Sequence, residues 1–248
     1  MSKEVSKKAQ NTEVAEADLF TGSDSGFEGA SSQTFKTPFL KVLQALSPEL
    51  KKSDPKYSPD AEMGMLFNTA TNETMENVEV IVLKVEHSLI IWKPERGGFV
   101  GRYPKSMEDE VVTKKDGVQK WDAEGNKVND TIEFFCADVA NPGSIFILSL
   151  STASLKHAKS FATRLRMLRA NGVPVNVSWA GVWKISTTEE TNEKGSWYTI
   201  GSTPEFIRLI TKEERDNIVF PAKEMLKNAE ADYTVIESVH TEDDKVSY

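Results

Sequence analysis

Residues 88–103 carry the side chains of this chain that are best suited to binding chemistry. The segment leaves an apolar, strand-like run and enters a glycine-rich stretch with Gly97, Gly98 and Gly101. Aromatic rings and positive charges interleave along it: Trp92, Lys93, Arg96, Phe99, Arg102 and Tyr103. The bases of a single nucleic-acid strand stack on such rings, and cations follow its phosphates. The segment therefore predicts a single-strand binding surface; the alternative is an ordinary strand that ends in a surface turn.

A second candidate surface lies on a predicted helix over residues 154–170. Its apolar residues share one side at helical spacing, and Asn171-Gly172 supplies a C-terminal stop signal. The helix contains basic residues and no acid: Lys156, Lys159, Arg164, Arg166 and Arg169. Lys156, Lys159 and Arg166 lie together beside the apolar side, so we expect them to form an edge that faces phosphates. The alternative is a solvated face whose last arginines are favoured by the helix dipole.

The sequence offers little support for catalysis. The histidines His87, His157 and His240 are scattered, and the lone Cys136 gives no zinc-ligand spacing. The chain has neither a phosphate-binding Gly-x-x-x-x-Gly-Lys-Ser/Thr loop nor a Gly-x-Ser-x-Gly nucleophile turn. Carboxylates are plentiful but form no cluster that would single out a metal-dependent nuclease. We therefore expect no enzyme, no cofactor and no metal, and a buried thiol at Cys136.

The composition is typical of a globular protein of the cytoplasm. Of the 248 residues, 39% are apolar and 27% are charged, which fits a soluble domain with some disordered parts. No apolar run approaches the roughly 18 residues of a membrane span, and the N-terminus lacks the apolar stretch of a signal peptide. Because a single cysteine cannot form an internal disulfide, we expect a reducing, cytoplasmic setting without membrane contact.

The net charge of −8 belongs to the two ends of the chain. Residues 1–34 carry −3 and residues 228–248 carry −5, so the middle balances to zero and can bind a polyanion. We interpret residues 1–34 as a disordered segment, 35–228 as a single domain and 229–248 as an acidic tail. The tail can occupy the protein's own cationic groove or dock onto basic partners; the alternative is a solubilising end.

The order of the expected elements indicates the fold class. Strand patterns cover residues 63–68, 77–92, 131–138, 144–151, 175–185 and 196–201. Helical patterns cover residues 37–46, where a strand remains open, 154–170, and 204–228 with a break before Pro221. Residues 104–130 are predicted to be a loop or a projecting hairpin. Three strand regions, a helix and two strands predict a mainly β, α+β fold: an OB-like five-stranded barrel with a helix between strands three and four, flanked by extra helices.

Three segments together resemble the single-stranded DNA-binding proteins of tailed bacteriophages. They are the run from Pro38 to Pro48, the run from Trp92 to Gly101, and the acidic tail that ends in Tyr248. The resemblance implies an OB-like core that binds single strands without strong sequence preference, and a tail that recruits replication partners. It implies that the strand path is lined by Trp92, Lys93, Arg96, Phe99, Arg102 and Tyr103. It implies that the partner-binding end consists of Asp243, Asp244 and Tyr248.

Residues and resemblance together predict a non-catalytic phage protein of the host cytoplasm. It would coat single-stranded DNA in replication, recombination or transcription, and its tail would engage phage replication proteins or RNA polymerase. The alternative is a protein-binding adaptor for a host factor such as RNA polymerase or a defence protein. Its contact surfaces would then be the loop at 104–130 and both acidic ends. A third alternative is a component of the virion.

Overall fold

The structure is a computed structural model that describes residues 38–193, 195–200 and 204–233. Contacts divide the chain into two units, Met1–Phe35 and Lys36–Tyr248, and all described residues belong to the second. The expected N-terminal segment and the predicted tail residues Asp243, Asp244 and Tyr248 lie outside the described residues. Among the residues that are described, no helix has the length and apolarity needed to cross a membrane.

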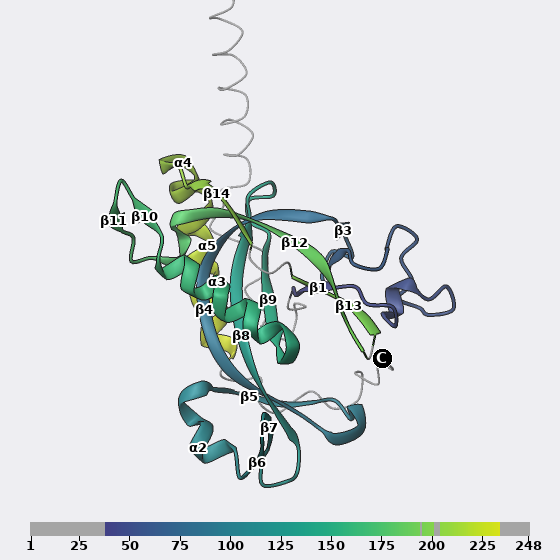
Figure 1. Cartoon of the computed structure of the whole chain (residues 1–248). Helices are drawn as coiled ribbons and strands as arrows, with labels where there is room; N and C mark the ends of the chain where they lie inside the picture. The colour runs from purple at the N-terminus through teal and green to yellow at the C-terminus, as the bar shows by residue number, and fades with distance from the viewer. Residues whose placement is uncertain (1–37, 194, 201–203, 234–248) are drawn as a thin grey trace, which may run out of the picture. The chain divides into compact units, whose positions relative to one another are not determined.

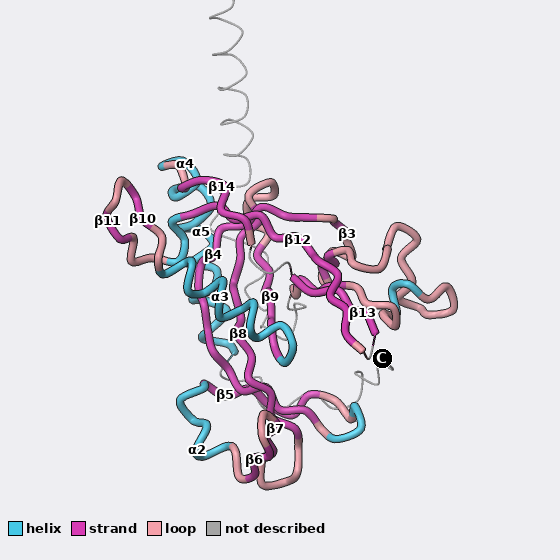
Figure 2. Tube along the Cα trace, viewed as in Figure 1, coloured by secondary structure: helices cyan, strands magenta, loops and turns pink. Residues whose placement is uncertain are grey.

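A curled antiparallel sheet dominates the described residues (Figures 1 and 2). Its strands lie in the order β13–β12–β4–β8–β9, and shorter strands β5, β6, β7 and β14 extend it at its ends and edges. The bounds are β4 (Asn77–Trp92), β5 (Phe99–Pro104), β6 (Lys114–Asp116), β7 (Gln119–Trp121), β8 (Lys127–Asp138), β9 (Ile145–Ser151), β12 (Gly181–Asn192), β13 (Gly195–Ile200) and β14 (Glu205–Leu209). The predicted mainly β, α+β class is confirmed, as a half-barrel with helices.

Strand β4 is buried on both faces over residues 80–83, which explains the uninterrupted apolar run there. Val80 and Val82 contribute to the main hydrophobic core, whereas Ile81 and Leu83 contribute to a second cluster on the opposite face. The register of β4 against β8 shifts between Val82 and Lys84. Such a bulge adds a residue to one strand and increases its local bend and twist, so this shift contributes to the curl of the sheet.

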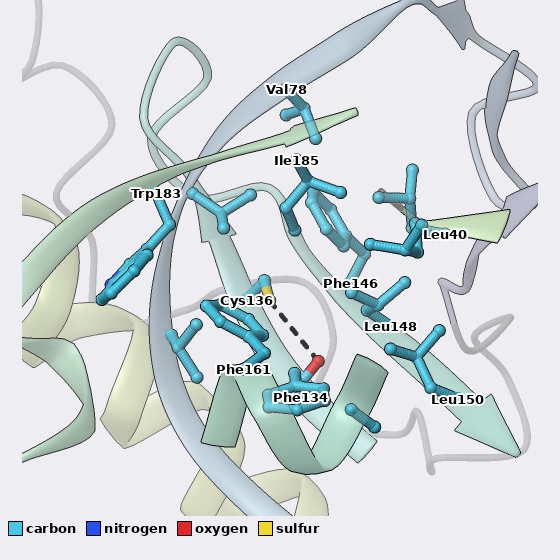
Figure 3. Packing of buried hydrophobic residues seen from close by; sticks show 14 of the residues in the cluster. Leu40, Val78, Phe134, Cys136, Phe146, Leu148, Leu150, Phe161, Trp183 and Ile185 are labelled. Atoms are coloured by element: carbon cyan, nitrogen blue, oxygen red, sulfur yellow. Dashed lines mark hydrogen bonds between the residues drawn. The ribbon is translucent and has the colours of Figure 1, made fainter. Parts of the chain in front are cut away.

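Helices cover the two faces of the sheet. Helix α3 (Leu155–Arg166) buries Ala158, Phe161 and Leu165 in the main core, against apolar side chains of β4, β8, β9 and β12. Figure 3 shows this core, in which the ring of Phe161 lies between those of Phe134 and Trp183. On the opposite face, the π-helical segment η7 (Arg215–Val219) and helix α5 (Phe220–Tyr233) cover Ile81, Leu83, Ala137 and Val182. A third cluster joins Leu89, Ile91 and Val128 to Val112, which follows helix α2 (Glu108–Val111).

A small antiparallel sheet connects the two edges of the curled sheet. It consists of β1 (Leu40–Val42), β2 (Leu66–Asn68) and β3 (Thr74–Met75). On one side, the Ile147 N–H of β9 donates to the Pro38 carbonyl over 2.8 Å. On the other side, Gln44 Nε2 donates to the Tyr198 carbonyl of β13 over 2.7 Å, and the Tyr198 N–H donates to Gln44 Oε1 over 3.0 Å. The side-chain amide of Gln44 thus makes the pair of hydrogen bonds to Tyr198 that the backbone of a neighbouring strand would otherwise make.

Two helical predictions were wrong in part. Residues 37–46 contain β1 rather than a helix, because Leu40–Val42 pairs with Leu66–Asn68. Residues 204–228 begin with β14, which pairs with β12, before α4 (Lys212–Glu214), η7 and α5 follow. The predicted break before Pro221 was wrong, because residues 212–233 are helical throughout; the π-helical segment η7 with its wider turns precedes Pro221, which has no N–H to donate.

Other boundaries also differ from the expectation. The strand expected over 175–185 begins at Gly181, because the short helix η6 (Ser178–Ala180) precedes it. Helix α3 ends at Arg166, and the predicted stop at Asn171-Gly172 is the tip of a hairpin between β10 (Arg169–Ala170) and β11 (Val173–Pro174). Residues 104–130 hold α2 and the projecting β6–β7 hairpin. The remaining short helices are η2 (Pro48–Leu50), η3 (Pro94–Arg96), η4 (Lys105–Met107) and η5 (Thr152–Ser154).

Candidate nucleic-acid interface

The predicted segment at Trp92 forms the hairpin between β4 and β5. Trp92 ends β4 and pairs with Phe99, the first residue of β5; their rings meet edge to face with centroids 5.8 Å apart. The Lys93 N–H donates to the Gly98 carbonyl over 2.9 Å, and Gly98 has a φ of +104°, which favours glycine. Trp92 is 39% exposed and Lys93 is exposed, so both can reach a ligand. Arg96 ends the short helix η3 within this hairpin loop.

Arg102 and Tyr103 lie on opposite faces of β5 because successive side chains of a strand alternate. Tyr103 packs against the third apolar cluster. Arg102 points the other way: its Nε donates to Glu133 Oε2 over 2.8 Å, and its Nη2 pairs with Glu86. Burial would raise the pKa of Glu86, but hydrogen bonds from Lys84 and Arg102 outweigh it and lower that pKa. The charge of Arg102 is therefore matched by carboxylates of the sheet.

A cleft of about 370 Å³ opens beside Tyr103, and its chemistry does not suit a polyanion. Apolar side chains and three carboxylates line it: Ile91, Val100, Tyr103, Met107, Glu110, Val111, Asp122, Ala123 and Glu124. Neither lysine nor arginine is among these lining residues. Asp122 is held by the turn that it caps, since its Oδ1 accepts from the N–H groups of Glu124 and Asn126. Glu110 and Glu124 are exposed and leave the rim negatively charged.

Helix α3 brings the second set of predicted residues together on one exposed face. Lys156, Lys159 and Arg166 are all exposed, and their spacing of three and seven residues places them on the same side. Lys156 pairs with Glu190 over 3.1 Å. Among the described residues, neither Lys159 nor Arg166 has a hydrogen bond or an ion pair through its charged group. We call this surface, defined by Lys156, Lys159 and Arg166, the basic face.

The other arginines near the end of the helix are engaged elsewhere. Arg164 Nη1 donates to the Pro204 carbonyl over 2.8 Å, and its guanidinium lies 5.2 Å from the centroid of the Trp183 ring. Arg169 Nη1 donates to the Gly172 carbonyl over 3.0 Å, within the β10–β11 hairpin. These two residues thus act on the packing of the helix end and of the hairpin, and the basic face rests on the remaining three.

A further group of lysines was missed by reasoning from the sequence. Lys105, Lys115 and Lys120 surround Glu108, with Lys120 Nζ 2.7 Å and Lys115 Nζ 3.2 Å from Glu108 Oε1. Lys105 and Lys120 also pair with Asp130. We call these five residues the lysine cluster. The turn signal at Asp116-Gly117 could have revealed part of this group, because a hairpin there places Lys115 and Lys120 opposite each other on adjacent strands.

The lysine cluster is a firmly charged network. Hydrogen bonds from Lys105 and then Lys120 lower the pKa of Glu108 to about 2. His87 Nε2 lies 3.4 Å from Asp130 Oδ1, and burial is the main cause that lowers the pKa of this imidazole. The charge of Lys159 also lowers the pKa of His87, which places the basic face within electrostatic reach of the cluster. Three lysines against two carboxylates leave the cluster with an excess of positive charge.

Cys136 and His157 are buried, and the described residues assemble no metal-binding group. They contain no grouping of three or more His, Cys, Asp or Glu side chains that could hold a metal ion. Cys136 is buried in the main core, as predicted, and its Sγ donates to the Phe134 carbonyl over 3.5 Å (Figure 3). His157 is buried, with its Nε2 2.7 Å from Glu190 Oε1. The histidine and the thiol therefore take part in the packing of α3 and the sheet.

The fold and surfaces define an α+β protein on a curled antiparallel sheet, with one basic helix face and one acid-rimmed cleft. The chain belongs to the family of Pam3 phage gp34-like proteins, whose model matches residues 6–240. It is therefore a phage protein, as the resemblance implied. Comparison with curated proteins gave no match, and comparison with solved structures gave none either.

Proposed function

We propose that this protein is a non-catalytic single-stranded DNA-binding protein of a bacteriophage, acting in the host cytoplasm. The observation that carries the proposal is the basic face of α3. Lys159 and Arg166 are exposed, have no ion pair among the described residues, and lie on a helix without a single acid. Cations that are not already neutralised can release counterions from a nucleic-acid backbone, which is the main source of affinity for a single strand.

The proposed strand path continues from the basic face to the lysine cluster. Lys159 lies within electrostatic reach of His87, which contacts Asp130 of the cluster. Phosphates that follow Lys156, Lys159 and Arg166 would thus meet the excess positive charge of the cluster. Trp92 and Lys93, at the exposed end of the β4–β5 hairpin, would supply a stacking contact and a cation.

The strand order supports an OB-like barrel as part of the proposal. In an OB-fold, a long first strand pairs with strands two and four, and a helix follows strand three. Here β4 pairs with β8 and β12, and α3 lies between β9 and β12 in the chain. The small sheet at β1 links the β9 and β13 edges. Tail residues Asp243, Asp244 and Tyr248 would recruit replication proteins or RNA polymerase in this proposal.

The test is a fluorescence-anisotropy titration of a labelled single-stranded oligonucleotide over a salt series. Wild type should bind at low salt, and the double variant Lys159→Ala/Arg166→Ala should bind more weakly. For this variant, the negative slope of log affinity against log salt concentration should become shallower by about 0.7 for each phosphate that it no longer neutralises. The matched control, Lys52→Ala/Lys212→Ala, removes two exposed lysines elsewhere and should bind like wild type. Equal affinity of all three proteins would refute the role of the basic face.

The second candidate function is a protein-binding adaptor, and the acid-rimmed cleft beside α2 favours it. An apolar floor with Glu110 and Glu124 at the rim fits a basic, partly apolar segment of another protein. A pull-down from infected host cells tests this function. Wild type should retain a partner that Glu110→Lys/Glu124→Lys loses, whereas the control Glu62→Lys/Glu76→Lys should keep it, because these glutamates are exposed away from the cleft. Identical partners for all three proteins would exclude the cleft as the docking site.

A further inference from the structure

A second cleft, of about 470 Å³, opens at the C-terminal end of the basic face. It lies between α3, the middle of β4 and the segment that follows the β10–β11 hairpin, which extends from the end of α3 in Figure 1. Its lining is Val85, Ala162, Leu165, Arg166, Val175, Asn176, Val177 and Ser178. Arg166 belongs to both surfaces, so a ligand phosphate on the basic face would lie at the mouth of this cleft.

The walls of the cleft are held in place by hydrogen bonds on both sides of the segment 175–178. The Val175 N–H donates to the Leu168 carbonyl over 2.9 Å, which anchors the segment beside the end of α3. Ser178 Oγ donates to the Leu83 carbonyl over 3.1 Å, which anchors it to β4. The cleft is therefore preformed, and a ligand would not have to order the segment when it binds.

The chemistry of the lining is that of a site for a flat group with a polar edge. Val85, Leu165 and Val177 provide apolar lining, and no acid is among the lining residues. The polar groups at the mouth are the guanidinium of Arg166 and the amide of Asn176, and both residues are exposed. An amide both donates and accepts hydrogen bonds, so it can pair with the edge of a nucleobase. A guanidinium pairs with phosphate.

We propose that this cleft receives one nucleobase of the bound strand, with Asn176 at the base edge and Arg166 on the adjoining phosphate. The volume lies within the range of roughly 300–1,000 Å³ that small-molecule sites occupy, which leaves room for a base and part of its sugar. This inference rests on the proposed function, because the basic face must first bring the strand to the cleft. It assigns to residues 175–178 a role in base binding that neither their composition nor their spacing indicates.

The test compares a normal oligonucleotide with one of equal length in which the bases are replaced by abasic tetrahydrofuran sites. The base in the cleft gains apolar burial and edge contacts, so wild type should prefer the normal strand by about fivefold or more. Asn176→Ala removes the edge contact, and Ala162→Leu fills the cleft from α3. Both variants should lose the part of this preference that comes from the cleft, keep the part that comes from stacking on Trp92, and keep wild-type affinity for the abasic strand. Ser160→Leu, which adds the same side chain outside the lining, should behave like wild type.

The outcomes separate this inference from the proposed function. If wild type binds neither strand at low salt, the proposed function fails and the cleft loses its ligand. If wild type binds both strands and the cleft variants keep its full preference, single-strand binding stands and the base site is overturned. A nuclear magnetic resonance titration adds an independent readout: the side-chain amide signals of Asn176 should shift with the normal strand and stay in place with the abasic strand. Unmoved signals with both strands would also overturn the base site.

Discussion

At the scale of single residues, neighbouring positions of the predicted segment have different roles. Arg102 and Tyr103 are adjacent in the sequence, yet one pairs with Glu86 and Glu133 and the other packs in an apolar cluster on the other face. The sequence shows the residue types of Arg102 and Tyr103 and predicts that their side chains point to opposite faces of a strand. It does not show that Glu133, on a distant part of the chain, lies under the guanidinium of Arg102.

The structure predicts that Arg102 acts on stability. Arg102→Ala leaves the carboxylate of Glu133, which is only 5% exposed, without its charged partner. Removal of one partner from such a pair costs about 1–3 kcal/mol, so the free energy of unfolding should fall by this amount. Urea denaturation measures it. Lys93→Ala, which removes an exposed cation from the same hairpin, is the control and should unfold like wild type. Equal stability of both variants would show that the carboxylates do not depend on Arg102.

At the scale of elements, the strongest sequence patterns gave the correct structure. Strands β4, β8 and β9 and helix α3 were predicted because their β-branched runs or helical spacing extend over many residues. The helical pattern over residues 37–46 left a strand open, because the spacing of Leu40–Val42 cannot reveal that Leu66–Asn68 pairs with it. The same holds for β14, whose partner is β12. The candidate site follows this rule: α3 could be predicted with its cations, whereas the lysine cluster depends on contacts between separate elements.

The lysine cluster should make the anchoring of α2 and the β6–β7 hairpin sensitive to acid. The pKa of Glu108 lies at about 2 in the folded chain, below its ordinary 4.5. A lowered folded pKa means that this contribution to stability is complete above pH 4.5 and is lost as the pH falls towards 2. Glu108→Gln should therefore unfold more easily than wild type at pH 7, and the difference should shrink below pH 4.5.

Urea denaturation at pH 7, 4 and 3 measures this difference. Glu62→Gln is the control, because Glu62 is exposed and has no ion pair through its carboxylate among the described residues. It should follow the wild-type dependence on pH throughout. The free energies of unfolding of Glu108→Gln and wild type could instead differ by the same amount at all three pH values. In that case, Lys105, Lys115 and Lys120 would not control the ionisation of Glu108.

The link between the small sheet and β13 should depend on a single side chain. Gln44→Ala removes the two hydrogen bonds between Gln44 and Tyr198. The partly buried backbone N–H of Tyr198 is then left without a partner. We expect a loss of about 1–3 kcal/mol in the free energy of unfolding and faster hydrogen exchange at the Tyr198 amide. Gln119→Ala, on the exposed tip of the β6–β7 hairpin, is the control. Unchanged exchange at Tyr198 would show that the β13 edge is held without Gln44.

At the scale of the whole molecule, strand β4 contributes to two clefts whose linings differ in charge. Strand β4 contacts the cleft at Arg166 through Val85 and the acid-rimmed cleft through Ile91, so one strand connects a cationic surface with an anionic one. The chain outside residues 35–227 adds −8, while those residues are neutral. A polyanion that approaches the basic face thus meets little net repulsion from the domain, and under the proposed function the acidic ends would be its main electrostatic competitor.

Deletion of residues 234–248 should therefore strengthen binding to single-stranded DNA. The deletion leaves α5 (Phe220–Tyr233) whole and removes a net charge of −3. Affinity measured by anisotropy should rise several-fold at low salt, and the gain should shrink as salt screens the tail. A full-length variant with Glu237, Glu242, Asp243 and Asp244 changed to their amides should show a gain at least as large, because it removes four negative charges and charge rather than length is the cause. If both proteins bind like wild type at every salt concentration, the tail does not compete with the strand for the basic face.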